Sequence, residues 1–168
     1  MPKITVVTIT FNLIKNGRRD YFIQNMESVH NQTYKNIEHI VIDGASTDGT
    51  VDLLKEYQAK GYIKFWSEPD TGIYDAMNKG IQHATGDYIT YLNSDDFYDS
   101  RALDIVANAL KKSDADFLSG NARIVYEDGS ICYIMNTKHE EFFVRMPFCH
   151  QSLFVKKDLM EKLGGFDT

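Results

Sequence analysis

Two adjacent acidic residues, Asp95 and Asp96, follow a short apolar stretch over residues 88–92, with Asn93 and Ser94 between. The stretch predicts a buried strand, so both carboxylates lie where that strand ends and repel each other unless a cation or donors compensate. Mg²⁺ and Mn²⁺ prefer carboxylate oxygens and often share oxygens of a bound phosphate. The pair is therefore a candidate site for one of these ions. The alternative is that Asp96 or Ser100 caps the helix that follows.

Polar side chains also follow two other predicted strands. The residues at these places are Thr10, Phe11 and Asn12 at the end of the first strand and Asp43, Gly44 and Ser46 after the second, and Asn93 follows the strand before the acidic pair; all but Phe11 and Gly44 carry polar side chains. Open parallel sheets bind ligands beyond the carboxyl ends of their strands, so these residues are expected on one rim. Asp43 can accept hydrogen bonds from a base or ribose, or it can cap the turn that follows.

Other candidate residues carry weaker signals. Asp75 and Lys79 are four residues apart on a predicted helix, which suits a surface ion pair, although Lys79 can also serve a phosphate near Asp95. His150 can face a substrate or be solvated. Phe11 and Tyr74 are the aromatic residues best placed to stack on a base or sugar. The chain lacks G-x-G-x-x-G and the P-loop pattern, so the usual dinucleotide and P-loop signatures are missing.

The elements that position these residues alternate between strands and helices. Apolar runs predict strands over 4–11, 37–42, 63–66 and 88–92, and helical spacing predicts helices near 19–31, after Thr47 or Asp48, over 73–84 and over 101–111. Further strands are expected over 116–120, 122–126 and 130–134, the last two joined by a hairpin at Asp128-Gly129. Such alternation predicts an α/β fold, with a mostly parallel sheet flanked by helices.

Composition narrows the class of protein. The chain has 168 residues, 43% of them hydrophobic, which suits one globular domain. Its net charge of -6 disfavours a nucleic-acid partner. Two distant cysteines favour a reducing compartment. No signal-peptide pattern opens the chain, and no apolar run reaches the roughly 18 residues of a membrane span.

In order along the chain, five motifs resemble the family 2 glycosyltransferases, in particular bacterial members linked to O-antigen and other surface polysaccharides. The motifs are Ile4 to Asn12, Ile40 to Thr50, Asp70 to Asp87, Leu92-Asn93-Ser94-Asp95-Asp96, and Cys149 to Phe154 with Leu163-Gly164-Gly165-Phe166-Asp167. The resemblance implies a GT-A (Rossmann-like) fold and metal-dependent, inverting transfer of a sugar. The donor would be a nucleotide diphosphate sugar, first of all a UDP-sugar, and the acceptor a saccharide or a lipid-linked acceptor.

The same resemblance implies roles for individual residues. The nucleotide-binding set is Thr8, Thr10 and Phe11 beside the nucleoside, Asp43 at the base, Asn78 and Lys79 near the phosphates, and Asn93 and Ser94 near the ribose. Asp95 would ligate Mg²⁺ or Mn²⁺ with support from Asp96, and His150 and Gln151 would lie on the acceptor side. Residues 1–112 would form the nucleotide-sugar-binding region, and residues 113–168 an incomplete acceptor-side region of the same domain.

The chain departs from the family pattern at three places. Met77 stands where many relatives have Arg, so phosphate binding rests on Lys79 or a residue outside the motifs. Asn93 replaces the first Asp of the D-x-D motif. The catalytic base is unassigned and expected beyond Thr168, so this chain is expected to bind donor and metal but to transfer poorly.

The alternatives to a glycosyltransferase are a non-catalytic nucleotide- or saccharide-binding module and an inactive fragment. The expected location is the cytoplasm, with peripheral contact at the inner membrane face.

Overall fold

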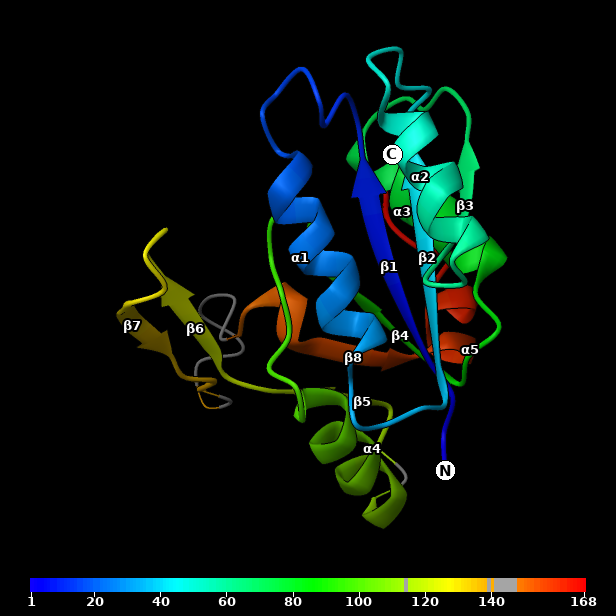
Figure 1. The fold of residues 1–168 in the computed structure, drawn as a ribbon. Coiled ribbons are helices and arrows are strands. Elements are labelled where there is room, and N and C mark those ends of the chain that lie inside the picture. The colour runs from blue at the N-terminus through cyan, green and yellow to red at the C-terminus, as the bar shows by residue number, and fades with distance from the viewer. Residues whose placement is uncertain (114, 139, 141–147) are drawn as a thin grey trace.

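The computed structural model describes residues 1–113, 115–138, 140 and 148–168. Its main feature is a six-stranded sheet in the order β3-β2-β1-β4-β8-β5 (Figure 1). The strands are β1 (Ile4–Thr10), β2 (Ile37–Asp43), β3 (Lys64–Ser67), β4 (Tyr88–Tyr91), β5 (Phe117–Ser119) and β8 (Leu153–Lys156). The first four are mutually parallel, whereas β8 runs antiparallel to both β4 and β5. The predicted α/β fold with a mostly parallel sheet is confirmed.

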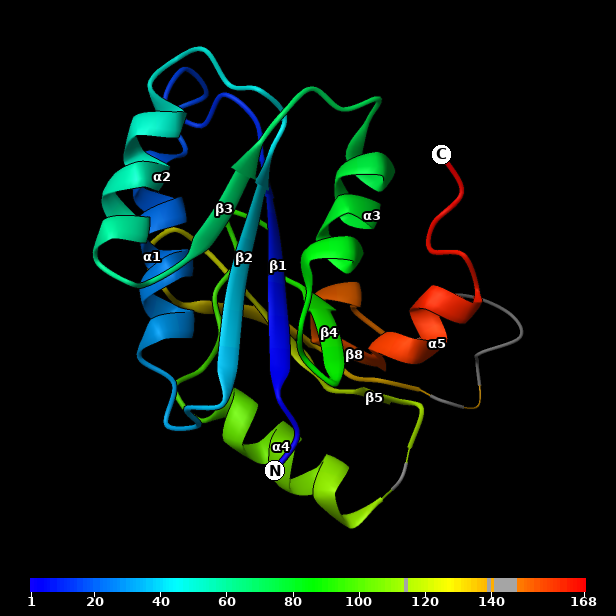
Figure 2. The same ribbon diagram turned by 90° about the vertical axis from the view of Figure 1, so that its right-hand side faces the viewer.

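Helices cover both faces of this sheet. They are α1 (Arg19–His30), α2 (Thr50–Ala59), α3 (Ile73–His83), α4 (Ala102–Lys112) and α5 (Lys157–Lys162), with a 3-10 turn η2 at His150–Ser152. Figure 2 shows α1 and α2 on one side of β1 and β2, and α3 and α5 on the other. No helix in the described ranges is long and apolar enough to cross a membrane.

Strand β1 lies at the centre because its side chains are buried on both faces. Val6 packs in a cluster with Val29 of α1 and residues of α4, while its neighbour Val7 packs against α3. Helix α3 comes unusually close, since a Cβ on Gly80 would lie 2.5 Å from a methyl carbon of Val7. An apolar strand covered on both sides is what its β-branched sequence predicted.

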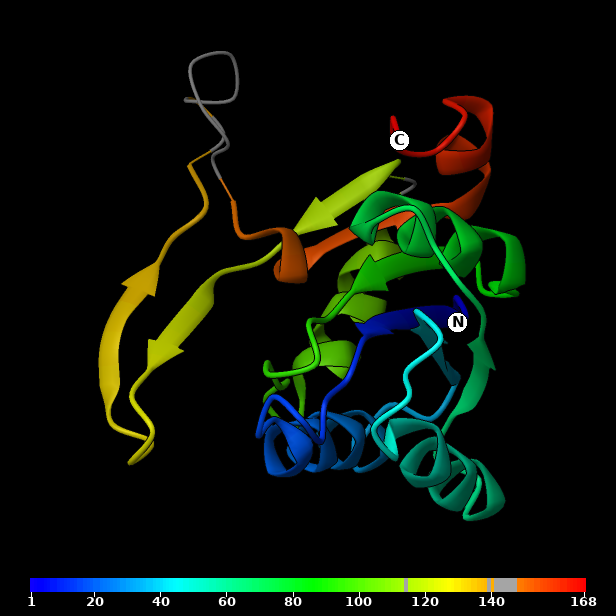
Figure 3. The same cartoon turned by 90° about the horizontal axis from the view of Figure 1, so that it is seen from above.

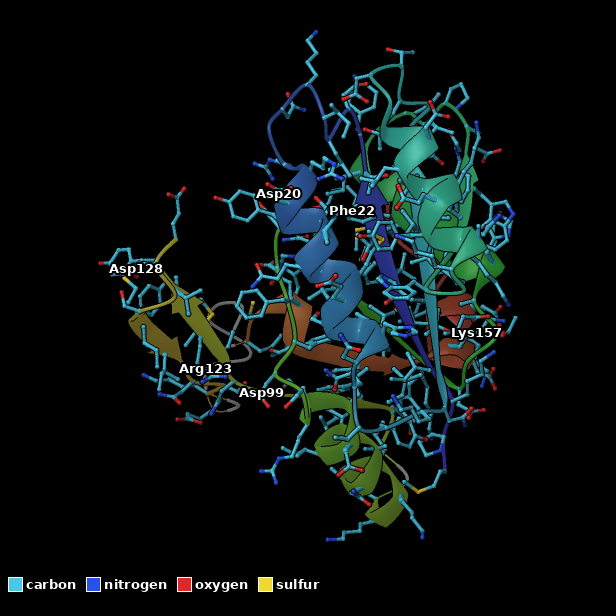
Figure 4. All side chains as sticks on the ribbon, viewed as in Figure 1. Asp20, Phe22, Asp99, Arg123, Asp128 and Lys157 are labelled. Carbon is cyan, nitrogen blue, oxygen red and sulfur yellow. The ribbon has the colours of Figure 1, made fainter. Side chains whose placement is uncertain are left out.

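A second, two-stranded sheet stands apart from the main one. Strands β6 (Ala122–Val125) and β7 (Ile131–Met135) form a hairpin that projects sideways in Figures 1 and 3. Its turn contains Gly129 at a positive φ of 81°, as the Asp-Gly pair predicted. The labelled side chains of Figure 4 show Arg123 of β6 reaching Asp99, an ion pair of 2.9 Å that ties the hairpin to the segment after β4.

The predicted elements agree with the structure except at a few boundaries. Strands β1 and β4 end one residue earlier than expected, at Thr10 and Tyr91, which leaves Phe11 and Leu92 in the rim loops. Helix α2 begins at Thr50 after Gly49, and Asp48 accepts hydrogen bonds from the Thr50 backbone and hydroxyl. The apolar run that became β8, and helix α5, were not assigned from sequence.

Candidate functional site

A cavity opens at the point where the strand order of the sheet reverses. From β1 the chain proceeds outward through β2 to β3, and then crosses over α3 to place β4 on the other side of β1. The loops leaving β1 and β4 therefore diverge and leave a crevice between them. The cavity there has a volume of about 520 Å³. The residues lining it are Ile9, Thr10, Phe11, Arg18, Asp70, Ile73, Asn93, Ser94 and Asp95.

Asp95 presents its carboxylate to this cavity. Its side chain is 40% exposed and accepts one ion-paired hydrogen bond, from Nη1 of Arg18 at 2.6 Å. Arg18 ends the loop between β1 and α1, and its backbone is fixed by a hydrogen bond from its N–H to the Leu13 carbonyl. The Asp95 carboxylate thus keeps acceptor sites that a ligand or an ion can use.

Asp96 lies behind Asp95 and is more enclosed. Gln151 Nε2 donates to Asp96 Oδ2 at 3.0 Å, and the Cys149 thiol donates to Gln151 Oε1 at 2.5 Å. Burial raises the pKa of Asp96, and the neighbouring Asp95 charge raises it further, against the opposing hydrogen bond from Gln151. His150 is exposed and close enough for its charge to act on Asp96. The acidic pair and the predicted acceptor-side residues are therefore in one place.

Asn25 of α1 holds the acidic loop, residues Asn93 to Asp96, in place through its side chain. Its fully buried amide Nδ2 donates to the backbone oxygens of Asn93 at 2.8 Å and Asp96 at 3.0 Å. The Asn93 carbonyl also accepts from the Asp96 N–H at 3.0 Å, and Asn25 adds a buried donor to both loop carbonyls. One side chain thus fixes both ends of the Asn93 to Asp96 segment.

Thr8 lies deeper than its predicted role at the nucleoside requires. It is fully buried on the α1 side of β1, 3.0 Å from Nε2 of His39 and 3.5 Å from Asn25 Oδ1. Burial lowers the pKa of His39 to about 3, so the ring is neutral. The structure places Thr8 outside the cavity lining and in a buried polar chain that ends at Asn25.

Asp43 is likewise sealed inside the sheet edge. Its carboxylate accepts from Thr10 Oγ1 at 3.0 Å, from Ser67 Oγ at 2.7 Å, and from both the hydroxyl and the backbone N–H of Ser46 at 2.5 and 2.9 Å. These four hydrogen bonds fill the acceptor sites of a carboxylate, and the residue is 0% exposed. The geometry matches the alternative expectation for Asp43, the fixing of the turn that follows β2.

Asn78 and Lys79 of α3 are both engaged by protein groups. The Asn78 amide pairs with the backbone N–H and C=O of Phe166 at 2.8 and 2.9 Å. Lys79 donates to the Pro69 carbonyl at 2.6 Å and pairs with Glu68 and Asp75. Neither belongs to the described cavity lining. The structure therefore gives both residues roles in holding the loop before α3 and the segment after α5.

The two predicted aromatic platforms differ in availability. Phe11 lines the cavity and is 60% exposed. Tyr74 is 53% exposed, but it is outside the cavity lining and its ring is stacked on that of Phe166, with ring centroids 5.8 Å apart. Asp70 approaches Phe11 across Gly44, where an added Cβ would lie 2.6 Å from Asp70 Oδ2 and 3.3 Å from Phe11 Cδ2. Phe11 thus forms an apolar wall of the cavity. The lack of a side chain at Gly44 allows Asp70 to lie close to Phe11.

The donor set fits a hard divalent cation that completes its shell with ligand phosphates and water. Within the described residues, no three His, Cys, Asp or Glu side chains converge on one point. Asp95 and Asp96 supply carboxylate oxygens at the rim, and Asn93 and Ser94 supply amide and hydroxyl oxygens beside them. Mg²⁺ is commonly held by one or two carboxylates plus phosphate oxygens, so this incomplete set is the expected kind.

Sequence reasoning missed three residues of this site: Arg18, Asn25 and Asp70. A signal existed for Asp70, because it follows the third predicted strand and the rule applied to the other strand ends extends to it. Arg18 and Asn25 reach the acidic loop across 77 and 68 residues of sequence, respectively. Their role becomes visible only when α1 is placed beside β4.

Comparison with known proteins identifies the family of this chain. The model of the family described as glycosyl transferase family 2 matches residues 5–159. The chain is 36% identical, over 99% of its length, to an uncharacterized glycosyltransferase of Mycobacterium tuberculosis, and it covers 63% of that relative. The chain thus spans less than two thirds of the length of this curated relative.

Solved structures share the fold at low sequence identity. Residues 1–349 of TarS from S. aureus, in complex with UDP-GlcNAc, superpose with a TM-score of 0.77 at 18% identity, covering 98% of this chain and 48% of theirs. The mannosyltransferase PcManGT of Pyrobaculum calidifontis, in complex with GDP-Man and Mn²⁺, gives 0.69 at 24% identity, covering 99% and 48%. The fold is therefore the GT-A fold of these glycosyltransferases, and with the family match over residues 5–159 the chain belongs to glycosyl transferase family 2.

Proposed function

We propose that this protein takes part in the metal-dependent, inverting transfer of a sugar from a nucleotide diphosphate to a saccharide or lipid-linked acceptor, in the synthesis of surface polysaccharide. The observation that carries the proposal is the cavity between the ends of β1 and β4. It joins an exposed aromatic ring, an arginine and an accessible carboxylate. A nucleoside diphosphate offers matching groups, because its base stacks on a ring and its phosphates attract cations.

We assign a part of the donor to each group of the cavity. Phe11 and Thr10 face the nucleoside, and Asn93 and Ser94 offer hydrogen bonds to the ribose and the first phosphate. Asp95, supported by Asp96, holds Mg²⁺ or Mn²⁺, which would supply electrostatic stabilisation for the departing diphosphate. The complexes of TarS with UDP-GlcNAc and of PcManGT with GDP-Man and Mn²⁺ support this class of donor.

The acceptor is proposed to approach from the side of η2. Gln151 and His150 lie beside Asp96, and β8 joins their segment to the main sheet. Residues 1–112 would then contribute the donor site, and residues 113–168 the first part of the acceptor side. The carboxylate that takes the acceptor proton is proposed to be separate from the acidic pair, since Asp95 is assigned to the metal and Asp96 accepts a hydrogen bond from Gln151.

Calorimetric titration with UDP, with and without Mn²⁺, tests the donor site. We expect binding by the native chain that depends on Mn²⁺ and is lost in Asp95→Asn. Asp20→Asn is the matched control, because Asp20 is also exposed and paired with an arginine, but lies outside the cavity lining. If UDP does not bind, GDP and dTDP follow, and failure of all three with Mn²⁺ present would refute the proposal.

A further inference from the structure

The ion pair between Arg18 and Asp95 places a cationic side chain on the carboxylate proposed for the metal. The atoms Nη1 and Oδ2 are 2.6 Å apart, a short charge-assisted hydrogen bond. Both side chains are about half exposed, at 50% and 40%, so water and ligands reach the pair. Exposed pairs contribute little to stability, which makes this one inexpensive to break.

Arg18 is also the one basic side chain among the described residues that line the cavity. It faces two acidic side chains there, Asp70 and Asp95. An anionic diphosphate entering this cavity without compensation would meet a negative surface. Lys79, the cation expected from sequence, is occupied by Glu68, Asp75 and the Pro69 carbonyl. Arg18 is therefore the cation that the fold leaves for the diphosphate.

A divalent ion and a guanidinium compete for the same carboxylate. An ion ligated by Asp95 repels the positive charge of Arg18. It also occupies the Asp95 carboxylate, which is the partner that holds the Arg18 guanidinium in place. The backbone of Arg18 stays anchored through Leu13 and through the first turn of α1, where Phe22 N–H donates to the Arg18 carbonyl. Only the side chain is therefore required to move.

We propose that Arg18 neutralises Asp95 while the cation is absent and is transferred to the donor diphosphate when the cation binds. This exchange rests on the proposed function, because it needs a metal at Asp95 and a diphosphate in the cavity. Its consequence is a coupling between the two ligands. Arg18 opposes binding of the metal alone and favours binding of the nucleotide once the metal is present.

The test measures two affinities in Arg18→Gln and in the matched control Arg19→Gln. Arg19 is the adjacent arginine, paired with Asp20 and outside the cavity lining. With Mn²⁺ alone, followed by the electron paramagnetic resonance of the free ion, Arg18→Gln should bind roughly 3-fold more tightly than the native chain, the size expected for an exposed pair. With saturating Mn²⁺, the same variant should bind UDP about 10-fold or more weakly. Arg19→Gln should match the native chain in both.

The outcomes separate this inference from the proposed function. Native protein that binds UDP with Mn²⁺, together with an Arg18→Gln variant unchanged in either affinity, overturns the exchange and leaves the donor site standing. Weaker binding of Mn²⁺ alone by Arg18→Gln also overturns it, since the arginine would then not compete. Failure of the native chain to bind any of the three nucleotides overturns both. A melting temperature of Arg18→Gln close to that of the native chain confirms that the variant is folded.

Discussion

Acidic residues follow or end both β2 and β4 on the same edge of the sheet, but their burial and their hydrogen-bond partners differ. Asp43, at the end of β2, accepts four hydrogen bonds from protein groups and is 0% exposed. Asp95, just beyond the end of β4, is 40% exposed and has one side-chain partner, Arg18. The first carboxylate holds the rim together, and the second is available to a ligand.

This difference follows from the neighbours of each strand. Strand β2 lies between β1 and β3, whose ends supply the hydroxyls of Thr10 and Ser67 to Asp43. Strand β4 lies at the reversal of strand order, so the loop of Asp95 faces a crevice instead of another parallel strand. A carboxylate at a strand end is therefore informative only together with the place of that strand in the sheet.

The largest effect on stability is expected for Asp43→Ala. The change removes the acceptor of the Thr10, Ser46 and Ser67 hydroxyls, of which Thr10 is buried, and leaves a void at the fully buried position of Asp43, so the free energy of unfolding should fall by about 3 kcal/mol or more. Urea denaturation measures this loss, with Asp43→Asn as the milder control. A stable Asp43→Ala protein that had lost UDP binding would contradict the comparison and restore Asp43 to the nucleobase.

Glu38 extends the comparison to the opposite end of β2. Burial tends to raise the pKa of Glu38, but hydrogen bonds from Thr85, Lys64 and Thr5 outweigh it and lower the pKa to about 2. A pKa depressed in the folded state gives stability that is present above the unfolded value near 4.5 and lost as the pH falls toward 2. The loss should amount to about 3 kcal/mol.

The measurement for Glu38 is urea denaturation at several pH values between 6 and 2. Glu38→Gln should be less stable than the native chain at pH 6, and the two should converge near pH 2. Glu56→Gln serves as control, because Glu56 is an exposed partner of Lys60. Parallel pH curves for the native chain and Glu38→Gln would show that this carboxylate does not supply the acid-sensitive stability.

An intermediate effect is expected for Asn25→Ala. The Asp96 carbonyl would lose its buried side-chain donor, and the Asn93 carbonyl would keep only the Asp96 N–H, at a cost of about 2 kcal/mol in unfolding free energy. The loop should also become less well placed, so UDP should bind more weakly in saturating Mn²⁺. Ser28→Ala, on the same helix and also hydrogen-bonded to the segment after β4 at Tyr98, is the control. A variant that is less stable but binds UDP with native affinity would limit Asn25 to a structural role.

The smallest effect on stability is expected for Asp95→Asn. Its one ion pair is exposed, so the unfolding free energy should stay within roughly 0.5 kcal/mol of the native value. The same protein should lose Mn²⁺-dependent UDP binding, which is the pattern opposite to that of Asp43→Ala. Marked destabilisation in urea would place Asp95 with Asp43 and remove the contrast between the two strand ends.

The sequence predicted the strands and helices well because their hydrophobic periods are clear and agree with their flanking turns. It also predicted the rim at which the cavity opens, since polar residues at the strand ends were not needed for an apolar core. It did not predict that Asp43 would be enclosed, because Ser67 reaches it from a strand 24 residues later. Lys79 was expected near the phosphates because of its charge. Its ion pair with Glu68 was not predicted, because that contact depends on the tertiary structure.

The central position of β1 has a consequence for how the chain reaches its native state. Strand β1 pairs with β4 from Ile4 opposite Tyr88, and Arg18 and Asp95 are 77 residues apart. Closing so long a loop is slow compared with pairing β1 to β2, so the cavity should be among the last features to form during refolding. A nucleotide that binds this cavity should therefore slow unfolding while leaving the rate of folding nearly unchanged.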